Sequence, residues 1–388
     1  MTLLAEITFW ASVALVLYAY LGYPGALLAL SFFRDRPVKR AESGTPPPRV
    51  SFIITAHNEQ ARIREKIENT LRQDYAPGVL EIIVASDCSR DGTDDIVRGY
   101  SSRVRLVRAP ERRGKEAAQQ LALRAASGDI LIFSDVATAL APDAVTTMIA
   151  NFADPSVGCV SSVDRFFDSD GRVSGEGAYV RYEMSVRALE TRVNSLVGLS
   201  GSFFAARREV CRRWAADRQS DFSTLLNAVD MGLRGVLDPR TAGYYRSVVD
   251  DRRELERKIR TVVRGIAVLA DNARMLNPLR HGMFAWQLAS HKLCRWLVPY
   301  AMLAAVLSNL LLLARSPFYV ATLILQCAFY AAAVAGLRTG ASSLRIPAYL
   351  LLANIGVLIA WFRFVRGERM AVWNPSERLA TLPSVGTR

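Results

Sequence analysis

Four long apolar segments stand out along the chain. Residues 7–33, 296–314, 317–337 and 346–362 contain no Asp, Glu, Lys or Arg. A helix needs about 20 apolar residues to cross the core of a bilayer, so the first three segments are predicted to be transmembrane helices. The fourth is shorter, and the pattern leaves open whether it crosses. Residues 34–295 are of mixed polarity and are numerous enough for one substantial domain.

The middle region alternates between two kinds of segment. Short β-rich apolar runs and longer amphipathic segments follow one another, as expected for a parallel sheet with helices on both faces. Ligands of such sheets bind at the carboxyl ends of the strands, so the residues after each strand are the place to search for chemistry. Strands are predicted at 50–55, 80–86, 104–109 and 129–135, and helices at 59–73, 91–101 and 114–126.

The chain divides accordingly into six parts. These are an N-terminal transmembrane helix (1–33), a basic, proline-rich linker (34–49), an α/β domain (50–270), an amphipathic interfacial helix (281–296), C-terminal transmembrane helices (296–366) and a polar tail (367–388). Basic residues favour the cytoplasmic side of a membrane, so the sequence RDRPVKR in the linker predicts a cytoplasmic α/β domain. Arginines after residue 362 favour the same side, whereas three crossings after the domain would place them outside. The sequence leaves this conflict open.

Composition narrows the function classes. A net charge of +13 fits binding to nucleic acid, or to anionic lipid and an anionic substrate. Apolar segments at both ends and the lack of a nucleic-acid-binding motif favour the second alternative. The five cysteines have no metal-type spacing and fit a reducing compartment without disulfides.

Each of the four predicted strands ends in polar residues. The segments read TAHNE (55–59), ASDCSRDGT (85–93), RRGK (112–115) and FSDVAT (133–138). Each is weak alone, since a strand-end acid is often a helix cap and RDGT is an ordinary turn. In this order and spacing they resemble the family 2 glycosyltransferases, which are inverting nucleotide-sugar enzymes. The resemblance covers about residues 50–265, and the apolar flanks are similar to the membrane-integrated branch that includes polysaccharide synthases.

The resemblance implies a GT-A fold and a donor site. The expected fold is a Rossmann-like α/β domain with a mostly parallel sheet, plus transmembrane helices at both ends. Thr55, Glu59 and Asp87 are expected to bind the nucleoside of the nucleotide sugar. Asp91 is as well explained by helix capping. Lys115 stands at a helix start, where anions are favoured, and is expected to face phosphate; a solvated surface lysine is the alternative.

The segment FSDVAT implies a metal site that lacks one ligand. Asp135 aligns with the first acid of the family's Asp-x-Asp motif, which implies that it binds Mg²⁺ or Mn²⁺ beside the donor diphosphate. The third position of that motif is Ala137, which has no ligand atom, while Thr138 keeps its hydroxyl. We therefore expect either weak metal binding or help from the donor phosphates, water and a residue of the second half.

The second half supplies a base and basic residues. Asp221 occupies the place of the family's catalytic acid, which deprotonates the acceptor hydroxyl; an N-cap is its alternative reading, and Asp230 is the rival acid. The segment RRELERKIRTVVRG resembles the Gln-x-x-Arg-Trp region of processive synthases. Arg257 and Arg260 are expected there to bind the diphosphate, although a basic helix on anionic lipid is also compatible. Thr261 replaces the tryptophan.

These expectations combine into one functional hypothesis. The chain is predicted to be a multi-pass protein of the inner cell membrane with a cytoplasmic catalytic domain. It would move a hexose-type sugar from a nucleotide donor, first of all a UDP-sugar, to a glycan or lipid-linked acceptor in cell-surface polysaccharide or glycolipid synthesis. Membrane lipids are expected contacts, nucleic acid is not, and a second copy or a synthase or export partner is compatible. A non-catalytic or partner-dependent subunit is the alternative, which Ala137 and Thr261 favour.

Overall fold

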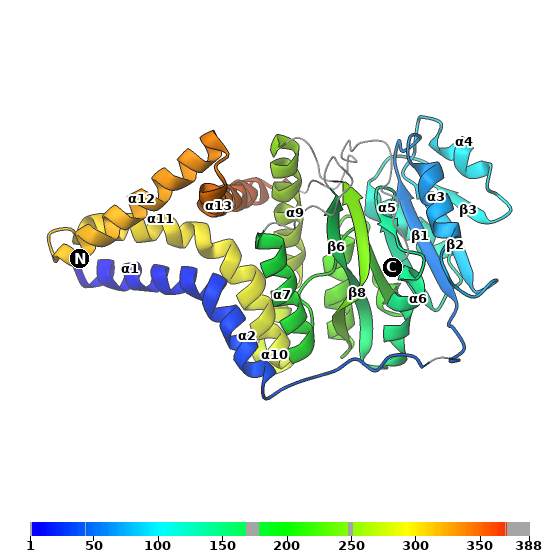
Figure 1. Ribbon diagram of the computed structural model, residues 1–388, viewed down its shortest axis with the longest axis horizontal. Coiled ribbons are helices and arrows are strands. Elements are labelled where there is room, and N and C mark those ends of the chain that lie inside the picture. Colours follow the sequence, from blue (N-terminus) through cyan, green and yellow to red (C-terminus); the bar gives the residue numbers. More distant parts are fainter. Residues whose placement is uncertain (1, 43, 168–177, 247–250, 369, 371–388) are drawn as a thin grey trace.

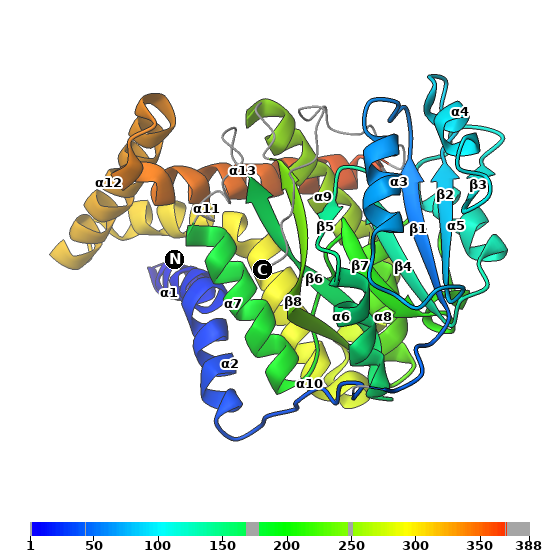
Figure 2. The same ribbon diagram turned by 45° about the vertical axis from the view of Figure 1, so that its right-hand side comes forward.

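The protein joins an α/β body to a group of long helices (Figure 1). The computed structural model describes residues 2–42, 44–167, 178–246, 251–368 and 370. The linker after the N-terminal helices runs along the body before the first strand begins (Figure 2).

The centre of the body is a mixed sheet. Within the described residues its strand order is β3-β2-β1-β4-β7-β6-β8-β5. The first four of these are parallel neighbours, whereas β7 runs antiparallel to both β4 and β6. The strands are β1 (Val50–Ala56), β2 (Leu80–Ser86), β3 (Val104–Arg108), β4 (Ile130–Asp135), β5 (Ala139–Leu140), β6 (Val157–Phe167), β7 (Phe203–Arg207) and β8 (Arg234–Arg246). The predicted α/β architecture is confirmed.

Helices cover both faces of the sheet because side chains alternate along each strand. Ile54 packs with the helices on one face and Ile53 with those on the other. The first face is covered by α3 (Ile63–Leu71), α4 (Thr93–Arg98) and α6 (Ala144–Ile149), and the second by α5 (Lys115–Ala125) and α8 (Ser220–Asp230). The helix predicted from residue 59 begins only at 63, because residues 59–62 form a turn closed by the Arg62 N–H on the Glu59 carbonyl.

Two helices complete the body, and short helical turns connect its elements. The two helices are α7 (Ala178–Val193) and α9 (Asp251–Asp271). The 3₁₀ turns are η2 (Ala150–Ala153), η3 (Val210–Arg212), η4 (Ala273–Leu276) and η6 (Ser342–Leu344).

Four helical segments are long and apolar enough to cross a membrane. They are Thr2–Ser31, Pro278–Leu312, Pro317–Thr339 and Arg345–Val365. The first segment consists of α1 (Thr2–Leu17), the π-helical η1 (Tyr18–Gly22) and α2 (Tyr23–Ser31). The second consists of α10 (Pro278–Leu288), the π-helical η5 (Ala289–Cys294) and α11 (Arg295–Leu312). The third and fourth are α12 (Pro317–Thr339) and α13 (Arg345–Val365). The segment predicted as a separate interfacial helix, 281–296, is therefore continuous with α11.

Candidate active site

A cavity of about 240 Å³ opens at the carboxyl ends of β1 and β4. It collects six of the eight site residues predicted from the sequence: Glu59, Lys115, Asp135, Asp221, Arg257 and Arg260. Residues that the sequence prediction did not include also line it, among them Glu116, Asp164, Gln219, Tyr245 and Arg264. Segments up to about 200 residues apart in sequence therefore converge on one acidic and basic cavity.

The other two predicted residues lie outside the cavity lining. Thr55 is fully buried, and its hydroxyl accepts a hydrogen bond from the Gln119 amide at 3.1 Å. Asp87 is also buried, and its two carboxylate oxygens accept the N–H groups of Arg113 and Gly114, both at 3.0 Å. Asp87 thus holds the turn that leads into α5, where Gly114 has a φ of +101°. Nucleoside binding by Thr55 and Asp87 stays a prediction.

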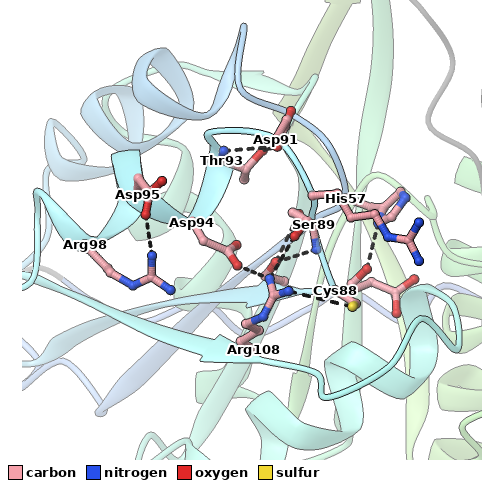
Figure 3. Close-up of polar contacts among 12 residues, drawn as sticks. His57, Cys88, Ser89, Asp91, Thr93, Asp94, Asp95, Arg98 and Arg108 are labelled. Carbon is pink, nitrogen blue, oxygen red and sulfur yellow. Dashed lines mark hydrogen bonds and ion pairs between the residues drawn. The ribbon is translucent and has the colours of Figure 1, made fainter.

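The turns after β1 and β2 interlock (Figure 3). Asp91 accepts hydrogen bonds from the N–H groups of Thr93 and Gln60, both at 3.0 Å. Asp91 therefore binds the first N–H group of α4, that of Thr93, while the N-cap position itself is Gly92. Asn58 and Cys88, one in each turn, have φ values of 52° and 53°. Such left-handed residues cost backbone strain and cluster at functional sites.

Glu59 is a buried acid at the rim of these turns. Its side chain is 3% exposed and forms an ion pair with Arg62 at 2.6 Å. Burial raises the pKa of Glu59 to about 7, although the Arg62 guanidinium opposes the shift. Glu59 therefore titrates near neutral pH and can act as an acceptor or as a donor of hydrogen bonds to a nucleoside.

Lys115 and Asp135 form an ion pair inside the cavity. The Lys115 ammonium lies 2.5 Å from Asp135 Oδ1 and 2.8 Å from the carbonyl oxygen of Gly201. The side chains are 10% and 25% exposed, which excludes the alternative of a solvated surface lysine. The Lys115 ammonium lies beside the Asp135 carboxylate. A diphosphate held at Asp135 through a metal ion would therefore also contact Lys115.

The donor atoms around Asp135 suit only one mode of metal binding. Among the described residues, no group of three His, Cys, Asp or Glu side chains could hold a metal ion, and Ala137 contributes no ligand. Mg²⁺ is nevertheless often held by one or two carboxylates plus substrate phosphates and water. Asp135 fits that mode, with its second carboxylate oxygen outside the Lys115 contact.

Lys66 braces the turn that carries Asp135. This lysine of α3 is fully buried, and its ammonium donates to Ser134 Oγ at 2.8 Å and to the Thr138 carbonyl at 2.6 Å. Burial lowers the pKa of Lys66 to about 7, while Asp135 opposes the shift. Sequence reasoning missed it, although its position between Ile63 and Ile67 on the apolar face of a helix was a signal.

Asp221 lies in the first turn of α8 and faces the cavity. It is 8% exposed, and its Oδ2 accepts a hydrogen bond from the Gln219 amide at 3.1 Å. A Cβ on Gly201 would lie 3.1 Å from this oxygen, so the residue bonded to Lys115 also borders Asp221. Burial raises the pKa of Asp221, against the opposing charges of Lys115 and Arg264.

The alternative readings of Asp221 do not fit. The helix is capped at Gln219 without a side-chain hydrogen bond, so Asp221 is not its N-cap. The rival acid, Asp230, lies at the far end of α8 and pairs with Arg213 and Arg274. Asp230 is not among the residues that line the cavity.

Three arginines of α9 border the cavity opposite the strand ends. Arg257, Arg260 and Arg264 all line it. Arg264 is 8% exposed and forms an ion pair with Glu116 at 2.6 Å, while its Nε has no hydrogen-bond partner among the residues that the structure describes. Burial and the neighbouring arginines lower the pKa of Arg260. Such a clustered set of cations favours an anionic ligand, and Thr261 lines the cavity beside them.

Comparison with known proteins identifies the family. Residues 51–214 match the model of Glycosyl transferase family 2. Residues 51–214 therefore belong to the family 2 glycosyltransferases. A mannosyltransferase from Pyrobaculum calidifontis, solved with GDP-Man and Mn²⁺, has a TM-score of 0.73 and 24% identity, with 93% of this chain and 99% of that chain covered. This likeness shows that the family 2 chain has the GT-A fold.

Two curated relatives are named N-acetylglucosaminyltransferases. The one from Bradyrhizobium elkanii is 35% identical over 122 residues, which is 30% of this chain and 66% of the relative. The one from Sinorhizobium fredii is 33% identical over 162 residues, which is 38% of either chain. The matched part therefore spans less than two thirds of these relatives.

Proposed function

We propose that this family 2 glycosyltransferase is an inverting, membrane-bound enzyme that moves a sugar from a nucleotide-sugar donor to a glycan or lipid-linked acceptor. The observation that carries the proposal is the single cavity in which Asp135, Asp221 and the arginines of α9 meet. An acid that can take a proton stands there beside groups that can hold a diphosphate, which is the pairing that an inverting transfer requires.

The proposed roles follow from position. Asp221 accepts the proton of the acceptor hydroxyl as that oxygen bonds to the anomeric carbon of the donor sugar. The bond from this carbon to the diphosphate oxygen breaks, and the electron pair leaves with the diphosphate. Lys115, Arg260 and Arg264 surround the charge that develops there. Preorganised cations of this kind lower the barrier because they need no reorganisation during the reaction.

A divalent cation is part of the proposal. Asp135 would hold Mg²⁺ or Mn²⁺ together with the donor phosphates, and the Mn²⁺ in the Pyrobaculum calidifontis structure supports this. Bound there, the ion would offset negative charge on the leaving diphosphate.

A UDP-sugar is the proposed donor. The nucleoside would lie toward the turns of Glu59, Thr55 and Asp87. The names of the curated relatives support an N-acetylhexosamine as the sugar, whereas the solved mannosyltransferase holds GDP-Man. Donors of both kinds, UDP-N-acetylhexosamines and GDP-mannose, therefore belong in the assay.

A membrane acceptor is proposed because long apolar helices adjoin the catalytic domain. The four segments able to cross a membrane support association with the inner membrane, and the basic linker supports a cytoplasmic active site. Synthesis of a cell-surface polysaccharide or glycolipid is the process that fits both.

The direct test is turnover by the full chain in proteoliposomes. UDP- and GDP-sugars are offered one at a time with Mn²⁺ or Mg²⁺, and release of nucleoside diphosphate is measured with and without membrane lipid extract. We expect release that depends on one donor and is stimulated by the extract. If the chain binds a donor but releases no nucleotide, while whole membranes do, the alternative of a partner-dependent subunit is correct.

A further inference from the structure

Helix α13 runs crosswise to α1 and α11. Figure 1 shows α1 and α11 lengthwise and side by side, whereas α13 is seen nearly end-on. In Figure 2, α13 is seen lengthwise, reaching from α12 to α9 of the catalytic domain. Because α1 and α11 extend away from that domain, their direction marks the path across the bilayer. Helix α13 is therefore not aligned with the direction in which α1 and α11 would cross the bilayer.

One side of α13 rests on α9 over several turns. The Lys258 ammonium lies 4.8 Å from the ring centroid of Tyr349. A Cβ on Gly356 would lie 3.4 Å from a methyl group of Leu255, so the backbone of α13 packs directly against side chains of α9 there. Ala360 is fully buried in a cluster with Ile259 and Val263 of α9. These contacts extend from the start of α13 to its last turns.

The end of α13 contacts α11 and the catalytic domain. The Trp361 indole donates to the carbonyl of Trp296 at 3.0 Å. Trp361 and Phe364 pack against the cluster that contains Phe222, the neighbour of Asp221. A transmembrane helix moves steadily away from a domain on one side of the bilayer, whereas α13 stays in contact with it.

The opposite side of α13 is apolar and exposed. On this side Ile355, Phe362 and Val365 are 39%, 57% and 78% exposed, and Ile346 in the first turn of the helix is 64% exposed. Arginines stand at both ends of the helix, at 345, 363 and 366. An apolar face with basic residues at its margins fits the boundary between acyl chains and anionic headgroups.

The turn between α12 and α13 allows the change of direction. Gly340 ends α12 with a left-handed φ of 67°. A Cβ on Gly336 would lie only 2.6 Å from the carbonyl oxygen of Leu344. The two helices can therefore fold sharply against each other where α12 leaves the bilayer.

We propose that α13 does not cross the membrane but lies in its surface on the side of the catalytic domain, with its apolar face in the lipid. The crossing segments are then Thr2–Ser31, Pro278–Leu312 and Pro317–Thr339. With α11 leading out and α12 leading back, the arginines after residue 362 are on the domain side. This resolves the conflict between apolar length and charge in the sequence. Helix α13 would then lie between the lipid surface and α9, whose arginines line the active site.

Depth in the bilayer tests the proposal without any need for transfer activity. A fluorophore is placed on single-cysteine variants Ile346→Cys, Ile355→Cys and Phe362→Cys of the full chain in vesicles that contain anionic lipid. Quenchers are attached near the headgroup or near the acyl-chain end. We expect the shallow quencher to be the stronger at all three positions. Leu325→Cys in the middle of α12 is the control and should favour the deep quencher.

Three outcomes are distinguishable. Deep quenching at 355 with shallow quenching at 346 and 362 would show that α13 spans the bilayer and would overturn the proposal. Absence of quenching at all three positions would show that a second copy or another protein covers this face, which also overturns it. Reporter fusions complete the test: a reporter after residue 388 should lie on the same side as the catalytic domain, and one in the turn at 313–316 on the other.

Discussion

The Lys115 ammonium lies 2.5 Å from Asp135 Oδ1, at the point where the proposed metal and diphosphate would bind. The pair balances the charge of a carboxylate that is 25% exposed, and a bound diphosphate would draw the lysine toward itself. This arrangement explains how the site tolerates Ala137, because a fixed cation supplies part of the charge that a tightly held metal would supply.

Replacing Asp135 by Asn should therefore remove metal-dependent function. We expect kcat for sugar transfer to fall by about 10²–10³, as for loss of one group that stabilises developing charge. Stimulation by Mn²⁺ should disappear, and calorimetric titration with the donor should show the same affinity with and without Mn²⁺. Asp95→Asn is the control, since that side chain is 80% exposed and pairs only with Arg98. Retained stimulation by Mn²⁺ in Asp135→Asn would show that the metal binds elsewhere.

Lys66→Met should lower activity without lowering stability at neutral pH. The variant loses the two hydrogen bonds that hold the turn of Asp135, and loss of such outer support typically costs about 10–100-fold in affinity or activity. Stability should not fall with it, because the variant no longer buries an ammonium group, and the cost of burying a charge exceeds the gain from two hydrogen bonds. Steady-state kinetics and thermal unfolding of the same preparations give the two readouts.

The pH dependence of the free energy of unfolding of Lys66→Met tests whether Lys66 titrates as a buried lysine. The pKa of Lys66 is about 7 in the folded protein against 10.5 in the unfolded chain. Between these values the unfolded chain binds more protons, so the wild-type free energy of unfolding rises with pH relative to Lys66→Met. Arg64→Met on the exposed side of α3 is the matched control and should follow the wild type. Parallel pH curves for wild type and Lys66→Met would contradict the burial of a titrating lysine.

The sequence predicted the parts of the site that depend on strand order. Glu59 and Asp135 could be placed because Asp135 ends a β-rich run and Glu59 closely follows one, and parallel neighbours bring such ends together. Lys66 could not, since its role depends on which face of a helix packs against the cavity. The direction of α13 was also out of reach, because apolar length is the same for a helix that crosses a bilayer and one that lies in its surface.

Arg264→Lys should weaken binding of the diphosphate but not of the nucleoside. Lysine keeps the charge beside Glu116, which is only 3% exposed in the ion pair, so a buried acid is not left alone. It loses the planar fork that binds phosphate through two donors. Hydrogen bonds to charged groups contribute about 1.5–3 kcal/mol, which corresponds to about 10–100-fold in affinity. Calorimetry with UDP and with uridine measures the two parts separately.

Arg274→Lys controls for general effects of the exchange. Arg274 is half-exposed and pairs with Asp230. Its replacement should leave both affinities unchanged. An equal loss for UDP and uridine in Arg264→Lys would assign the arginine to the architecture of the cavity rather than to the diphosphate.

Asp221→Asn should stop transfer while the donor still binds. The amide cannot take the proton of the acceptor hydroxyl, and loss of a general base costs about 10²–10⁴-fold in kcat. Donor affinity should change little, because the acid faces the acceptor in the proposed mechanism. Asp230→Asn, at the other end of α8, should keep its activity. Transfer that survives in Asp221→Asn would require another base.

The pH profile of the wild type carries the final test of this base. Burial raises the pKa of Asp221 above the ordinary 3.8. The base works only when deprotonated, so kcat should rise with pH along a limb whose midpoint lies above 3.8. Glu59 titrates at about 7 and bears on donor binding, so its titration should affect KM more than kcat. Glu59→Gln should therefore keep the kcat limb, whereas the residual activity of Asp221→Asn should lose it.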